Sequence, residues 1–289
     1  MTNLKMIRIC AQVNFQKWLV NSRIYTLAVL MIAFLAYHSF GLSQFAADKG
    51  IALTPWVFPH LITPPGLQVF ACFIILLFSD APFADRHMPF LIIRSGRRNW
   101  IIGQLLYIVV SALFFAIFIL FISVIVLIPN VQLSTDWGII LKTLAVSTEI
   151  VPSVTIFPDE RILTMFSVLE AMLISFGLFW LVSIFIGVLI FFFNIVVGKM
   201  SGLVASGVFI FISFFSIIHG RLILGDWISY LSPISWMSIS FFDWNNSMGF
   251  SSPSLMYAVI CLVGSIILMS IISTIVFCKK DLDIQEWGY

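Results

Sequence analysis

Residues 79–100 combine arginines with bulky apolar side chains in a way that suits docking to another protein. The arginines are Arg86, Arg94, Arg97 and Arg98, and the apolar residues include Phe83, Phe90, Leu91, Ile92 and Ile93. Arginine and large apolar residues are enriched where proteins bind one another. The mixture therefore predicts a docking helix over residues 82–95 at a membrane surface. The alternative is that these arginines only fix membrane topology.

Glu170 is the clearest ionisable side chain inside an apolar stretch. Charge at membrane depth is costly and usually functional, so Glu170 is expected either to line a substrate pathway or to face the outer interface. Ser206 and His219 are 13 residues apart, about 20 Å along one helix, which excludes a catalytic dyad within that helix. Ser206 instead belongs to a cluster of small residues, Ser201, Gly202, Ala205, Ser206 and Gly207, that predicts close helix packing.

No other pattern predicts catalysis or a metal site. Asp80, Asp85 and His87 match no metal-binding spacing, and the Gly-x-x-x-x-Gly-Lys-Ser/Thr phosphate loop is absent from the sequence. We therefore expect no catalytic residue and no cofactor bound by this chain. By the phosphate-loop route, it could not hydrolyse ATP on its own.

The composition identifies an all-α integral membrane protein with one transmembrane domain over residues 1–289. The chain is 61% hydrophobic and 10% charged, against about 25% charged residues in a soluble domain. Apolar runs of about 20 residues match the thickness of the hydrocarbon core. Six spans are expected, at about 23–41, 60–79, 101–128, 163–197, 203–219 and 255–278, of which the fourth is long enough to tilt or protrude.

The distribution of basic residues sets the expected orientation. With the N-terminus inside, 11 of the 15 Lys and Arg residues fall on the cytoplasmic side. We therefore expect a multi-pass protein of the cytoplasmic membrane with both termini in the cytoplasm.

Two further surface elements are expected. Residues 3–18 place Leu4, Ile7, Ala11 and Phe15 on one face, which predicts an amphipathic helix at the inner interface. Residues 226–244 are aromatic but interrupted at Pro233, which indicates two short helices that dip into the outer leaflet as a re-entrant hairpin. Trp227, Tyr230, Trp236 and Trp244 are expected at the headgroup level there.

Local signals suggest where the docking helix begins and ends. Pro82 is expected to open it, because the missing amide hydrogen is unbonded in a first turn, and Pro89 to kink or restart it. Gly96 is expected to end it, and Asn99 to cap the third span.

The layout, with Phe78-Ser-Asp-Ala-Pro-Phe83 and Arg94-Ser-Gly-Arg-Arg-Asn-Trp-Ile-Ile-Gly-Gln104, resembles the membrane subunits of type-2 ABC exporters. These stretches also resemble small Gram-positive permeases, some of which export or give immunity to antimicrobial peptides. The chain lacks the sizeable extracellular domain of large members. The resemblance covers nearly the whole chain and implies six spans with a cytoplasmic coupling helix between the second and third.

The resemblance also implies partners and cargo. Two copies of a separate ATP-binding subunit would hold the ATP and Mg²⁺ and push on the coupling helix. The contact residues would be Phe83, Arg86, Phe90, Leu91, Arg94, Arg97 and Arg98. A second copy or a sister permease would complete the pathway within the bilayer, and no nucleic acid is involved.

The implied cargo is hydrophobic or amphipathic, with a peptide favoured. Glu170, Trp227, Tyr230 and Trp236 are the candidate pathway residues. Three alternatives stay open: export of a lipid-linked glycan or other lipid-like cargo, a non-transporting scaffold or sensor with a cytosolic partner, and an intramembrane hydrolase.

Overall fold

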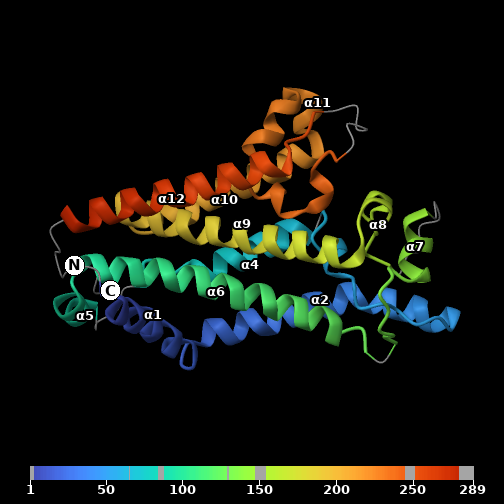
Figure 1. Cartoon of the computed structure of the whole chain (residues 1–289), viewed down its shortest axis with the longest axis horizontal. Coiled ribbons are helices and arrows are strands. Elements are labelled where there is room, and N and C mark those ends of the chain that lie inside the picture. The colour runs from blue at the N-terminus through green and yellow to red at the C-terminus, as the bar shows by residue number, and fades with distance from the viewer. Residues whose placement is uncertain are drawn as a thin grey trace.

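The structure is a computed structural model, and it describes residues 3–64, 66–83, 88–128, 130–146, 154–244 and 251–279. These residues form helices and connecting turns, with one isolated bridge between Leu53 and Val131 and no strand in the described ranges. Long helices run side by side along the molecule, with α1 and α5 at one end, α7 and α8 at the other, and α11 at the top of the view (Figure 1). The prediction of an all-α membrane protein is confirmed.

Five helices are long and apolar enough to cross a membrane. They are α2 (Ser22–Lys49), α6 (Arg97–Ile125), α9 (Val168–Val196), α12 (Leu255–Lys279) and a continuous stretch over Ser201–Leu224. The last comprises α10 (Ser201–Phe215), the π-helical turn η1 (Ser216–Gly220) and α11 (Arg221–Leu224). The chain is therefore a multi-pass membrane protein.

The expected second span is shorter and interrupted. It divides into α3 (Phe58–Leu61) and α4 (Gly66–Phe78), the latter with 13 residues. At 1.5 Å per residue, α4 is about 20 Å long, which is less than the hydrocarbon thickness of about 30 Å. Pro64 lies in the break, as expected for a residue that removes a backbone donor.

The expected fourth span, 163–197, is not one continuous helix. It is broken at Phe166 and Ser167 between α8 (Glu160–Met165) and α9. The Ser167 side chain accepts the Glu170 backbone N–H, and the Glu170 carboxylate accepts the Ser167 N–H, which together form a capping box. A single helix over 163–197 is therefore wrong, while tilt or protrusion of the 29-residue α9 stays a prediction.

The expected docking helix is also shorter than its predicted range. Its described part is α5 (Met88–Ser95), and residues 84–87, including Arg86, lie outside the described residues. Pro82 lies in a turn before it, so the prediction that Pro82 opens the helix is wrong. Helix α6 begins directly after Gly96, so Asn99 is in its first turn rather than at its cap.

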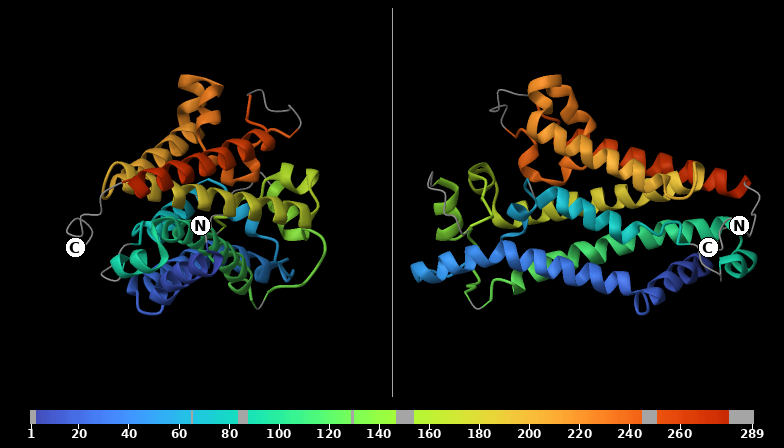
Figure 2. Two further views of the ribbon diagram at one scale, coloured as in Figure 1. Left: turned by 60° about the vertical axis from the view of Figure 1, so that its left-hand side comes forward. Right: turned by 180° about the vertical axis from the view of Figure 1, so that it is seen from behind.

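The Asn99 side chain binds backbone groups of two other segments, the end of α5 and the residue before α1. Its amide nitrogen donates to Ser95 O at 2.6 Å, and its oxygen accepts the Asn3 N–H at 3.0 Å. The predicted N-terminal helix is confirmed as α1 (Leu4–Trp18), capped by Asn3. Figure 2 shows α1 and α2 following one another along one side of the bundle.

The expected re-entrant hairpin is not a pair of α-helices. Residues 226–244 form three short 3₁₀ turns, η2 (Asp226–Leu231), η3 (Ser235–Met237) and η4 (Ile239–Phe241). Pro233 lies between η2 and η3, where it interrupts helical hydrogen bonding. Serines 229, 232, 235 and 238 are buried there, and their hydroxyls bond to other side chains.

Helix α9 is the centre of the packing. In its most apolar 18-residue stretch, 67% of the residues are buried, against 17% for α12. Helix α10 approaches α9 closely at Gly202. An added Cβ there would overlap the carbonyl oxygen of Ile190 on α9. The predicted small-residue packing face is therefore confirmed at Gly202 and at buried Ser206, but it is wrong at exposed Gly207, which has open space around it.

Candidate functional site

Helix α5 presents an apolar face to the outside of the protein. Met88, Ile92 and Ser95 are buried against the bundle. On the opposite side, Phe90 is 67% exposed and Ile93 is 81% exposed. Helix α5 lies at one end of the molecule, next to α1 (Figure 1). This short amphipathic helix therefore offers a surface that another protein could cover.

Only some of the residues predicted to contact a partner protein face outward. Arg94 and Arg98 are exposed, and Leu91 is half-buried. The Arg97 guanidinium donates to Cys278 O at the end of α12, 3.1 Å away. Phe83 packs its ring edge-on against Tyr107 of α6, with 4.7 Å between ring centroids. The outward-facing part of the predicted set is therefore Phe90, Arg94 and Arg98.

The turn before α5, residues 79–83, is held by three other helices. Lys17 of α1 donates to Phe83 O at 3.1 Å. Arg23 of α2 forms an ion pair with Asp80 at 2.5 Å. Asn194 of α9 donates to Ala81 O at 2.7 Å. Each contact uses a backbone or side-chain group within the same five residues, so the 79–83 turn links α1, α2 and α9 directly to the segment leading into α5.

Asn194 extends this connection to α10. While its amide nitrogen binds Ala81, its oxygen accepts the Gly202 N–H at 2.8 Å. Gly202 is in the first turn of α10, where amide hydrogens have no partner within the helix. Sequence analysis did not single out Asn194. The feature of the sequence that could have identified it is a single asparagine that follows three phenylalanines near the end of an apolar run.

At the other end of the molecule, Glu170 has a structural explanation. Its carboxylate accepts the Ser167 N–H at 2.9 Å and the Ser167 hydroxyl at 2.8 Å, and the pair caps α9 from an exposed position. No described cavity includes Glu170 among its lining residues. Its expected role in a substrate pathway stays a prediction.

The three aromatic side chains expected in the substrate pathway differ in how exposed they are. Trp227 is 53% exposed. Tyr230 is half-buried, and its hydroxyl lies 2.8 Å from the Ser251 hydroxyl. Trp236 is buried. Its indole N–H donates to Ser229 O at 3.0 Å, and its ring packs on Tyr257. Trp236 therefore packs inside the protein, and its position at headgroup level stays a prediction.

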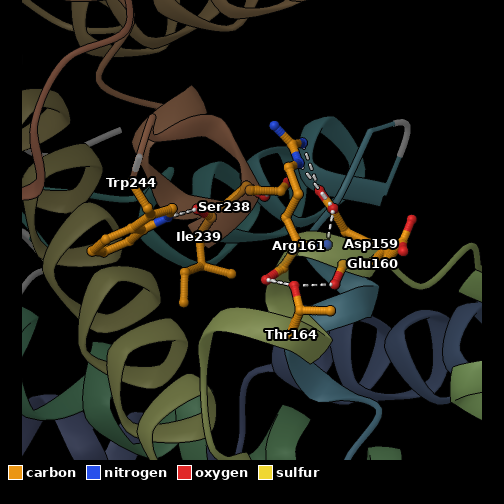
Figure 3. Close-up of polar contacts among 8 residues, drawn as sticks. Asp159, Glu160, Arg161, Thr164, Ser238, Ile239 and Trp244 are labelled. Carbon is orange, nitrogen blue, oxygen red and sulfur yellow. Dashed lines mark hydrogen bonds and ion pairs between the residues drawn. The ribbon is translucent and has the colours of Figure 1, made fainter. Parts of the chain in front are cut away.

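A cavity of about 500 Å³ opens beside these turns. Its walls come from the start of α4, the segment before α8, the η1–α11 stretch and the 235–241 turns. Arg161 and Asp159 line it and form a double hydrogen bond, Nε to Oδ1 at 3.0 Å and a terminal nitrogen to Oδ2 at 2.7 Å (Figure 3). These bonds raise the pKa of Arg161 above its usual value, so the guanidinium stays charged.

Among the described residues, no group of three or more His, Cys, Asp or Glu side chains could hold a metal ion. Asp80, one member of the cluster considered from the sequence, is instead paired with Arg23. Asp85 and His87 lie outside the described residues.

No protein-family model, no curated protein and no solved structure matches the chain. The assignment of function therefore depends on the chain's own residues.

Proposed function

We propose that this chain is the transmembrane subunit of an ATP-driven exporter of the type-2 ABC class, powered by a separate ATP-binding subunit that docks on α5. The observation that carries the proposal is the exposed apolar face of α5, where Phe90 and Ile93 lie next to Arg94. Large apolar groups beside a guanidinium are typical of the centre of a protein interface.

The contacts of the 79–83 turn support a mechanical role for this surface. A displacement of α5 would act on a turn that contacts Lys17, Arg23 and Asn194. Helices α1, α2 and α9 would then respond together, and α10 would follow through the bond between Asn194 and Gly202. Nucleotide state in the partner would thereby bias the arrangement of the spans.

In the proposed assembly, the chain lies in the cytoplasmic membrane with α1 and α5 on the cytoplasmic side. A second copy or a sister permease completes the pathway, and two ATP-binding subunits hold the ATP and Mg²⁺. The proposed cargo is a hydrophobic or amphipathic molecule, with a peptide favoured because of the sequence resemblance to small peptide-export permeases.

The test is co-expression of the chain with its neighbouring genes and co-purification of any ATPase, for wild type and for Phe90→Ala combined with Ile93→Ala. Burying one large apolar side chain contributes about 1.5–3 kcal/mol, so the double variant should weaken binding at least about tenfold. The matched control is Phe211→Ala on α10, where the phenylalanine is 66% exposed but far from α5 in the sequence.

The proposal requires that wild type and Phe211→Ala recover an active ATPase and that the double variant lose it. Equal ATPase recovery by all three proteins would refute docking on α5. Recovery of a partner without any ATPase activity would favour the scaffold or sensor reading instead.

A further inference from the structure

The cavity beside the 3₁₀ turns contains an arginine that forms no ion pair with a described residue. Arg221 projects from the start of α11 and lines the cavity. Its Nε donates to the Ser229 hydroxyl at 2.9 Å. In the described part of the chain, no carboxylate lies within ion-pair distance of Arg221, and its two terminal nitrogens make no hydrogen bond to a described residue.

Aromatic contact fixes the direction of this guanidinium. Its central carbon lies 4.9 Å from the ring centroid of Phe241, close enough for a cation–π interaction. Phe241 and Ser229 together therefore restrict the orientation of the guanidinium. A preorganised guanidinium presents a planar pair of donors that matches a carboxylate or a phosphate.

The charge balance of the cavity wall also favours an anion. Its charged lining residues are Arg161, Arg221 and Asp159, and because Asp159 already pairs with Arg161, one positive charge is left over. Two further acidic residues, Asp226 and Asp243, do not line this cavity, but Asp226 attracts the Arg221 charge and Asp243 the Arg161 charge at longer range. The Asp226 carboxylate accepts the Ser251 N–H at 2.8 Å.

The remaining wall divides into polar and apolar parts. Ser235, Ser238 and Ser240 contribute hydroxyl groups, which can donate to an anion after rotation. Leu67, Phe157 and Ile217 contribute apolar surface. The volume of about 500 Å³ lies within the range of about 300–1,000 Å³ that is usual for small-molecule sites.

We propose that this cavity binds an amphipathic molecule through an oxyanion, a carboxylate or a phosphate, that contacts Arg221. The apolar part of the ligand lies against Leu67, Phe157 and Ile217. The proposal goes beyond the proposed function and does not depend on it, because binding here requires neither ATP nor a partner subunit.

Equilibrium binding to the full chain in nanodiscs of zwitterionic phosphatidylcholine tests the proposal. The first probe pair is octanoyl-triglycine with a free carboxylate and the same molecule as its carboxamide. The second pair is dihexanoyl phosphatidic acid and dihexanoyl phosphatidylcholine. The anionic member of at least one pair should bind at least about tenfold more tightly than its neutral partner, since charge-assisted hydrogen bonds are the strong ones.

Three variants locate the binding. Arg221→Gln should abolish the preference for the anion. Ser240→Asp, a change at a half-exposed position, should abolish it independently by adding a negative charge to the wall. Arg8→Gln, at an exposed position of α1, is the control and should bind as wild type does.

Equal affinities for the charged and neutral members of both pairs in the wild-type protein would overturn the proposal. So would an anion preference that survives both Arg221→Gln and Ser240→Asp in folded protein. Preference confined to the phosphatidic acid pair would assign the oxyanion to a lipid, and preference confined to the carboxylate pair would assign it to a peptide-like ligand. Either result supports the site, and neither bears on ATPase docking.

Discussion

Gly202→Ala should destabilise the protein, whereas Gly207→Ala, five residues further along the same helix, should not. A Cβ at Gly202 would overlap the carbonyl oxygen of Ile190 and lie 2.7 Å from its Cα, and backbone of α9 cannot move aside as a side-chain end can. A Cβ at Gly207 would meet no heavy atom within 4 Å. The two substitutions therefore differ in packing but share the same chemistry.

The magnitude follows from two opposing effects. Replacing a helical glycine with alanine favours the helix by about 0.5–1 kcal/mol, and this effect cancels between the two variants. Forcing an extra carbon into a packed interface costs about 1–3 kcal/mol. The free energies of unfolding of the two variants should therefore differ by about 1–3 kcal/mol, which lowers the melting temperature of Gly202→Ala relative to Gly207→Ala by about 2–10 °C.

Thermal unfolding of the detergent-solubilised chain, followed by tryptophan fluorescence, measures this difference. Wild type should fall between the two variants. Equal melting temperatures for the two variants would show that α10 does not approach α9 as closely as described, and the reasoning about this interface would fail.

Two other contacts allow similar tests. Asn194→Leu leaves the Ala81 carbonyl and the Gly202 N–H unpaired and buried, which should lower the free energy of unfolding by about 2–5 kcal/mol; full stability in thermal unfolding would contradict the bridge. Gly103→Ala would place a Cβ 2.6 Å from Cβ of Cys10 on α1. The overlap should push α1 away from α6 and make α1 more sensitive to proteolysis. Gly177→Ala, whose Cβ would meet no atom within 4 Å, is the control and should leave proteolysis unchanged.

The apolar runs predicted the membrane character and most of the long helices because hydrophobicity over about 20 residues is a strong, local signal. Leu255–Lys279 lies within a residue of its predicted bounds. The errors occurred where a side chain bonded to the backbone in a way that hydropathy does not report. Ser167 and Glu170 interrupt the expected fourth span, and Asn99 ties the start of α6 to Ser95.

The candidate site was predictable only in part, for a related reason. The exposed face of α5 follows from local alternation of apolar and basic residues, so Phe90 and Arg94 could be selected from the sequence alone. Lys17, Arg23 and Asn194 lie 66, 57 and 113 residues from the groups that they bind in the 79–83 turn. A single sequence carries no signal for such pairings.

Helix α10, continued by η1 and α11, extends from the contact with Asn194 to the proposed anion site. Its first turn is bound by Asn194, which also holds the 79–83 turn before α5. At its other end, η1 gives way to α11 and Arg221, on the wall of the 500 Å³ cavity. Single π-helical turns often mark functional sites within helices. The same element is therefore joined through Asn194 to the 79–83 turn and carries the arginine of the proposed anion site, so a displacement of that turn could act on the cavity wall through α10.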